Sequence, residues 1–167
     1  MDQIAKLNEL KALENGKTDS ERIQYIVIRL GEEQFGIDIR YIDNIVRMQN
    51  ITRVPKVANY LKGVINLRGE VIPVMSIRLK MGLEADEITR ASRIIILKLG
   101  EQGNVGIIVD EVKEVVTLNT EEIEKVAHDS KIATVDEKAS FINGVGKHGG
   151  ELISLLDLNS VTLEDNV

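Results

Sequence analysis

The stretch "KGVINLRGEVIPVMSI", residues 62–77, contains two short apolar runs on either side of an Arg-Gly tip. Runs of this length, rich in Ile and Val and interrupted by glycine, are typical of a β-hairpin. The pattern returns at residues 143–158 as "NGVGKHGGELISLLDL", where Gly144 matches Gly63 at an offset of 81 residues and a glycine stands in place of Arg68. The hairpin therefore does not need an arginine, and Arg68 is either an ordinary solvated charge or a partner contact.

A second pair of segments shows that most of the chain is duplicated. "RLGEEQFGIDIRYIDNIV" (29–46) resembles "KLGEQGNVGIIVDEVKEVV" (98–116), and Gly36 matches Gly106 at an offset of 70 residues. Both copies keep the same order of pieces, which indicates one fold built twice. Each copy has about five short strands, too few for two packed sheets, and closing a small antiparallel sheet removes its edges. We therefore predict an all-β protein of two small five-stranded β-barrels.

The repeat also predicts the domain boundaries. Residues 22–90 form the first barrel with a connecting helix and linker, and residues 91–161 form the second. Residues 1–21 are polar apart from a broad, weak apolar stripe, so a frayed tail is preferred over a weak amphipathic helix. Residues 162–167 form a short tail.

Helical content is expected to be minor. Single helical turns are predicted at residues 40–46, where isoleucines recur at helical spacing, near residues 57–61, and after the last strand of each copy.

Composition excludes several function classes. The 167-residue chain has a net charge of −6, so it repels a phosphate backbone, and three tyrosines and two phenylalanines are too few for a base-stacking platform. It has no cysteine, hence no disulfide and no cysteine-based zinc site. The first residues lack the basic-then-apolar order of a signal peptide, and no run is long enough to span a bilayer. We expect a cytoplasmic protein.

Charge is distributed unevenly along the chain. Residues 40–80 contain eight basic and two acidic residues, and residues 101–140 contain four basic and ten acidic residues. Such a bipolar pattern can steer charged partners, although runs of charge are as often merely solvated faces.

Little in the sequence supports catalysis. His128 and His148 have no zinc-type spacing, no serine lies in a nucleophile elbow, and both histidines fit surface positions. Asp38, Asp43 and Asp110 could form a carboxylate pair, but Asp43 and Asp110 fit ordinary turn or cap positions. The glycines do not form a phosphate loop. We expect no enzymatic activity, no metal and no cofactor.

Five segments together carry a family resemblance. In chain order they are "LGEEQFGIDI", "ITRVP", "LKGVINLRGEVIPV", "GIIVDEV" and "INGVGKHGGELISLLDL". They resemble the CheW family of bacterial chemotaxis coupling proteins from about Tyr25 to Leu158. CheW-like domains also occur in the kinase CheA and in CheV, but no phosphotransfer, ATP-binding or receiver segment is left over here. The resemblance therefore favours a stand-alone coupling protein.

The resemblance implies a fold and a role. The fold is two SH3-like barrels around a shared apolar core. The role is a non-enzymatic scaffold that joins the cytoplasmic tips of chemoreceptors to the regulatory domain of CheA, recruited to membrane-associated receptor arrays. In the family, the groove between the barrels takes the receptor helix tip and one end of the first barrel meets the kinase.

The resemblance also implies site residues, position by position. The receptor-side candidates are Ile42, Asn44, Ile45, Gly63 and Arg68, with Gly63 as a backbone-shaping position. The kinase-side candidates lie around "ITRVP" and are Ile51, Val54 and Pro55.

Asn44 departs from the family pattern. Many members have a glutamate there, which pairs with the arginine that matches Arg68, whereas an asparagine can accept a hydrogen bond but carries no charge. Either Asp43 or Asp110 substitutes, or Arg68 is free to reach a carboxylate on the receptor.

Two other functions remain open at this stage. A small β-barrel enzyme or ligand-binding protein would use the groove between the barrels, although its Ile and Val content argues against converging polar groups. A CheW-like regulator of another kinase pathway would share every feature above.

Overall fold

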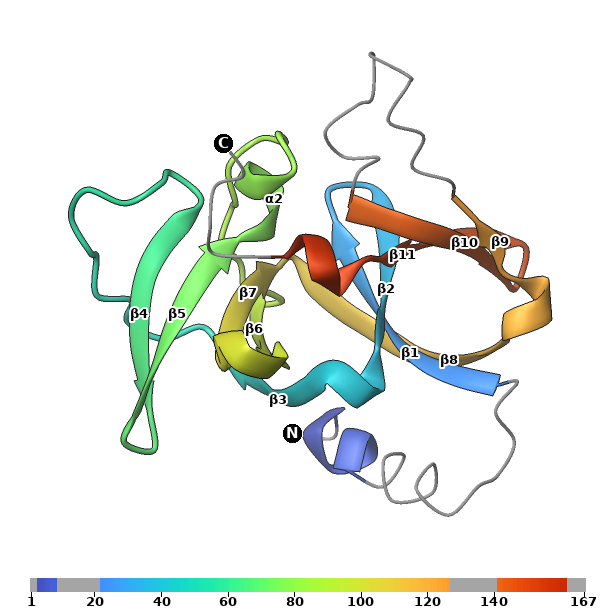
Figure 1. Ribbon diagram of the computed structural model, residues 1–167, viewed down its shortest axis with the longest axis horizontal. Helices are drawn as coiled ribbons and strands as arrows, with labels where there is room; N and C mark the ends of the chain where they lie inside the picture. Colours follow the sequence, from blue (N-terminus) through green and yellow to red (C-terminus); the bar gives the residue numbers. More distant parts are fainter. Residues whose placement is uncertain (1–2, 9–21, 127–140, 162–167) are drawn as a thin grey trace.

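The computed structural model describes residues 3–8, 22–126 and 141–161, and most of these residues lie in two β-sheets (Figure 1). The strands are β1 (Arg22–Leu30), β2 (Glu33–Asp38), β3 (Ile42–Arg47), β4 (Leu61–Leu67), β5 (Glu70–Ser76), β6 (Arg93–Lys98), β7 (Asn104–Val109), β8 (Glu111–Asn119), β9 (Glu124–Lys125), β10 (Ile142–His148) and β11 (Glu151–Leu156). The short helices are η1 (Ile39–Tyr41), α2 (Ile77–Lys80), η2 (Gly100–Gln102), η3 (Thr120–Glu122) and η5 (Leu158–Ser160). The predicted all-β class is confirmed.

The strand order shows that the two halves of the chain exchange hairpins. The six-stranded sheet has the order β8-β1-β2-β11-β10-β9, and the five-stranded sheet has the order β3-β6-β7-β5-β4. The first hairpin of each half therefore lies in the sheet that holds the remaining strands of the other half. The predicted boundaries, with one barrel in residues 22–90 and the other in 91–161, do not match the sheets. Matching strand patterns in two repeats fit either arrangement, so the sequence does not distinguish them.

The registers confirm the duplication within this exchanged arrangement. The parallel pair β2·β11 places Gly36 opposite Leu155, and the parallel pair β7·β5 places Gly106 opposite Val74. Both members of the second pair are related to the first by the offsets of 70 and 81 residues. Hairpins β4–β5 and β10–β11 each contain a register shift just before the glycine of the repeat, Gly63 or Gly144.

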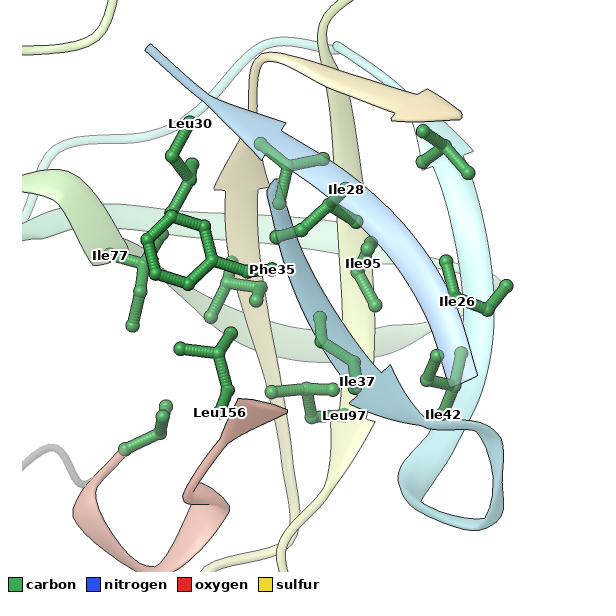
Figure 2. Packing of buried hydrophobic residues seen from close by; sticks show 14 of the residues in the cluster. Ile26, Ile28, Leu30, Phe35, Ile37, Ile42, Ile77, Ile95, Leu97 and Leu156 are labelled. Atoms are coloured by element: carbon green, nitrogen blue, oxygen red, sulfur yellow. The ribbon is translucent and has the colours of Figure 1, made fainter. Parts of the chain in front are cut away.

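The main hydrophobic core lies between the sheets and draws on both. The central strands β1 and β2 contribute one half and β6 and β7 the other, with Ile26, Ile28, Phe35, Ile37, Ile95, Leu97, Ile107 and Val109 among the buried residues (Figure 2). The opposite faces of β1 and β6 form smaller clusters inside each curved sheet, through Val27 in one and Ile94 and Ile96 in the other. Burial on both faces explains why these strands read as continuous apolar runs.

The six-stranded sheet curls so that distant strands approach each other. A Cβ added at Gly146 of β10 would lie 2.5 Å from a methyl of Leu118 in β8. The sheet thus wraps around its own apolar cluster, in keeping with the predicted barrel-like architecture.

The amino-terminal segment is helical at residues 3–8. Leu7 is completely buried in the main core, and the side-chain amide of Gln3 donates to the carbonyl of Val112 at 3.3 Å. The preferred interpretation as a frayed tail is wrong for these residues, because one leucine of the weak stripe finds a core to enter. Residues 9–21, residues 162–167 and His128 lie outside the described part of the chain.

The helical turn predicted at residues 40–46 is largely a strand. Only residues 39–41 form a 3-10 turn, and β3 follows with a register shift between Ile42 and Asn44. The shift places Ile42 and Ile45 on one face, which imitates helical spacing. Residues 57–61 form turns and the start of β4, whereas the predicted turns after the last strands are present as α2 and η5.

Candidate protein-interaction surfaces

A concave surface of about 720 Å³ lies over the connection between β3 and β4. All three kinase-side candidates, Ile51, Val54 and Pro55, line this concavity. Val54 and its neighbour Val57 are exposed, so the surface offers apolar side chains to a partner. The sequence had placed these residues together only as neighbours in one segment, and the structure places them on one surface.

The backbone of this segment is tied to β4. Thr52 and Val64 exchange two backbone hydrogen bonds of 2.8 and 2.9 Å. Gly63 permits the approach, because its φ is +143° and a Cβ there would lie 2.1 Å from the carbonyl oxygen of Thr52. The structure thus supports a backbone-shaping role for Gly63, and it places that role beside the concavity.

The charge at the concavity is basic. Arg53, Lys56 and Lys62 line it, and no acidic residue does. Other basic residues of the 40–80 region lie elsewhere: Arg40 pairs with Asp38 at 2.7 Å, for example. The positive balance of this region is therefore concentrated in part at one surface, which suits a partner with apolar and acidic groups.

Arg68 occupies the tip of the β4–β5 hairpin. Leu67 pairs with Glu70 across the tip, which leaves a two-residue turn with φ values of +54° at Arg68 and +86° at Gly69. Both values match a type I′ turn. The side chain is exposed, and among the described residues no hydrogen bond or ion pair engages its guanidinium.

Asn44 does not pair with Arg68. Its side-chain oxygen accepts a hydrogen bond from the backbone N–H of Ile45 at 2.9 Å. Asp110 does not substitute either, because its carboxylate is held by Arg78 at 2.5 Å. These contacts favour the alternative in which Arg68 is free to reach a carboxylate outside the chain.

Ile42 and Ile45 are core residues. Their side chains are 0% and 2% exposed, and both belong to the main cluster between the sheets (Figure 2 labels Ile42). The prediction that they contact a receptor is wrong for this structure, because neither has a surface to offer. Their spacing reflects the bulged strand β3.

Sequence reasoning missed a polar cluster where the two sheets meet. Asp110 follows β7, and its carboxylate accepts from Arg78 through two hydrogen bonds of 3.1 and 2.5 Å and from the N–H of Gly31 at 2.8 Å. Arg29 lies 3.6 Å away and also pairs with Glu111 at 3.1 Å. The turn position predicted for Asp110 is correct, but its burial and its ion pair were not apparent in the sequence.

Titration gives no sign of acid–base chemistry at the concavity. Burial raises the pKa of Tyr25 to about 12, the hydrogen bond to Asp110 raises the pKa of Arg78, and burial raises the pKa of Asp86. None of these three residues lines the concavity. His148 is a surface residue as predicted, with its Nε2 4.0 Å from Glu114.

Two further classes of site were searched for in the described residues. They contain no group of three or more His, Asp or Glu side chains placed to hold a metal ion. In residues 3–8, 22–126 and 141–161, no helix has the length and apolar character needed to cross a membrane.

The fold and these surfaces define a class: a duplicated two-sheet β protein that presents an apolar and basic concavity and an exposed arginine, as protein-interaction domains do. Residues 24–165 match the model of the CheW-like domain. The chain belongs to the CheW-like domain family.

Individual relatives agree with this membership. The chain is 29% identical to the chemotaxis protein CheW of Helicobacter pylori over 98% of this chain and 96% of that one. It is 35% identical to the chemotaxis protein CheW of Bacillus subtilis, over 81% and 84% of the two chains. The crystal structure of the scaffolding protein TtCheW from Thermoanaerobacter tengcongensis superimposes with a TM-score of 0.73 at 28% identity, covering 84% of this chain and 88% of that one.

Proposed function

We propose that this chain is a non-enzymatic adaptor of bacterial chemotaxis that couples chemoreceptors to the histidine kinase CheA. Membership of the CheW-like family supports this role, and the relative with a solved structure is a scaffolding protein. The adaptor acts where it is recruited, at membrane-associated receptor arrays. It needs no cofactor, because its work is to hold two partners in a fixed relation.

The concavity is the proposed site for the regulatory domain of CheA. The observation that carries this assignment is that Ile51, Val54 and Pro55 line one surface together with three cationic side chains. A buried apolar centre with a charged rim is the usual anatomy of a specific protein interface.

The β4–β5 tip is the proposed site for the receptor. Arg68 is exposed there and lies at the other end of β4 from the concavity (Figure 1). A guanidinium suits bidentate pairing with a carboxylate of a receptor tip. Two partners can therefore occupy one subunit at the same time.

Titration calorimetry of the full chain with the CheA regulatory domain of the same organism tests the kinase site. We expect saturable, near-equimolar binding, and we expect Val54→Lys to weaken it about tenfold or more, because a charge would enter the apolar centre of the interface. Val54 is exposed in the free protein, so the variant should fold.

Leu152→Lys is the matched control. Leu152 is also an exposed apolar residue, but it lies on β11 of the six-stranded sheet, and its substitution adds the same charge. Its affinity should stay within about twofold of the wild type. Equal losses in both variants would contradict the assignment of the concavity, and a wild-type chain that does not bind would contradict the coupling role.

A further inference from the structure

The two equivalent hairpin tips adopt the same turn with different residues. Arg68 and Gly69 have φ values of +54° and +86°, and their counterparts Gly149 and Gly150 have +59° and +81°. Glycine adopts these angles freely, whereas a residue with a Cβ is strained there. The turn shape is therefore a property of the fold, and Arg68 adopts it against its own conformational preference.

One side chain closes the tip that carries the arginine. The side-chain oxygen of Asn66 accepts a hydrogen bond from the backbone N–H of Gly69 at 3.0 Å. The counterpart of Asn66 in the second hairpin is Lys147, whose ammonium group can only donate. The extra hydrogen bond thus accompanies the strained arginine and is not part of the Gly-Gly tip.

The nearest acidic side chain is engaged elsewhere. Glu70 follows the turn directly, and its carboxylate accepts a hydrogen bond from the side chain of Asn104 on the neighbouring strand β7 at 3.4 Å. The guanidinium of Arg68 has no hydrogen bond or ion pair with the described residues. The tip consequently presents an unneutralised cation on a backbone of defined shape.

We propose that Asn66 is a positioning residue for Arg68. By holding the N–H of Gly69, it keeps Arg68 in the left-handed conformation and presents the guanidinium outward to a carboxylate of the partner. A preorganised contact group binds more tightly because less conformational freedom is lost on binding. This inference rests on the proposed receptor contact of Arg68 and adds the residue that orients it.

The test is a double-mutant cycle in the full chain, with binding measured to a soluble fragment that carries the cytoplasmic tip of the organism's own chemoreceptor. Asn66→Ala should weaken binding about fivefold, the effect of one hydrogen bond. Asn66→Asp should stay within about twofold, because its carboxylate can accept the same hydrogen bond. In an Arg68→Ala background, Asn66→Ala should cause no further loss.

Amide exchange of Gly69 provides a readout that does not depend on binding. It should speed up in Asn66→Ala and stay slow in Asn66→Asp, with the melting temperature of both variants near that of the wild type. These two results would show that the turn hydrogen bond has been removed or kept as intended.

The outcomes separate this inference from the proposed function. If Arg68→Ala binds the receptor tip normally, the receptor contact is wrong and the positioning role is wrong with it. If Arg68→Ala loses binding while Asn66→Ala binds like the wild type, only the positioning role is wrong. A loss from Asn66→Ala of the same size in both backgrounds would also overturn it, because Asn66 would then act without Arg68.

Discussion

Arg68 and Gly149 occupy the same position in two equivalent turns, which makes stability and binding separable at a single residue. The left-handed conformation costs an L-residue roughly 1–2 kcal/mol, and glycine avoids that cost at the expense of some chain entropy. Strain retained at an exposed and unpaired side chain suggests a function for that side chain.

Exchanging the two residues measures this strain. Arg68→Gly should raise the free energy of unfolding by about 0.5–1 kcal/mol and weaken receptor binding. Gly149→Arg should lower the free energy of unfolding by a similar amount, since it places the same side chain in the same turn. Urea unfolding measures both. A destabilised Arg68→Gly variant would contradict the idea that the arginine is strained.

At the residue scale, the sequence predicted Arg68 but not its surroundings. Comparison of the repeats was enough to single it out, because turn chemistry is local. The exposure of Ile42 and Ile45 was predicted incorrectly, because burial depends on which sheet covers β3. The partner of Asp110 was not predictable either, since Arg78 lies 32 residues away in the chain.

At the scale of elements, each repeat ends in the same device, a strand followed by a capped helical turn. Ser76 caps α2 by accepting from the N–H of Leu79 at 3.1 Å, and its counterpart Asp157 caps η5 by accepting from the N–H of Asn159 at 3.0 Å. Only the sequence of the first repeat adds a linker carboxylate: the hydroxyl of Ser76 also donates to Asp86.

Asp86 makes this junction sensitive to pH. Burial raises the pKa of its carboxyl group, although the hydrogen bond from Ser76 and the charge of Arg78 oppose the shift. One carboxylate oxygen is buried and, among the described residues, has no hydrogen-bond partner. A raised pKa in the folded state means that the ionised form is disfavoured there, so the stabilising contribution is present at low pH and is lost as the pH rises through the folded pKa.

Asp86→Asn should therefore be more stable than the wild type at neutral pH, because the amide keeps an acceptor for Ser76 and carries no charge to bury. The difference should shrink as the pH falls from about 7 to 4, where the wild-type carboxyl group becomes protonated. Urea unfolding across this range measures it. Glu87→Gln, the same charge change at an exposed neighbour, should have a smaller effect. A difference that grows on acidification would contradict the prediction.

At the scale of the whole molecule, the cluster around Asp110 joins the two sheets. Asp110 ends the passage from β7 of the five-stranded sheet to β8 of the six-stranded sheet, Arg78 comes from α2 after β5, and Gly31 lies in the β1–β2 turn. The side chains of Arg78 and Asp110 are only 14% and 10% exposed. Removing one partner would leave a largely buried charge uncompensated.

Asp110→Ala should lower the free energy of unfolding by about 3 kcal/mol or more. Glu111→Ala should cost no more than about 1 kcal/mol, because its pair with Arg29 is substantially exposed. Chemical denaturation of both variants compares the two ion pairs within one cluster. Equal and small losses would show that Asp110 does not hold the sheets together.

The sequence by itself determined what is local: the β class, the strand runs, the turn tips, the duplication and the family. Periodicity, turn residues and repeat spacing are short-range properties of the chain, so they can be predicted from neighbouring residues. Only the tertiary structure decided that the hairpins exchange between the sheets, that β3 is buried, and that residues 51–62 form a concave surface. These features depend on pairing between distant strands, and two repeats with matching strand patterns allow more than one such pairing.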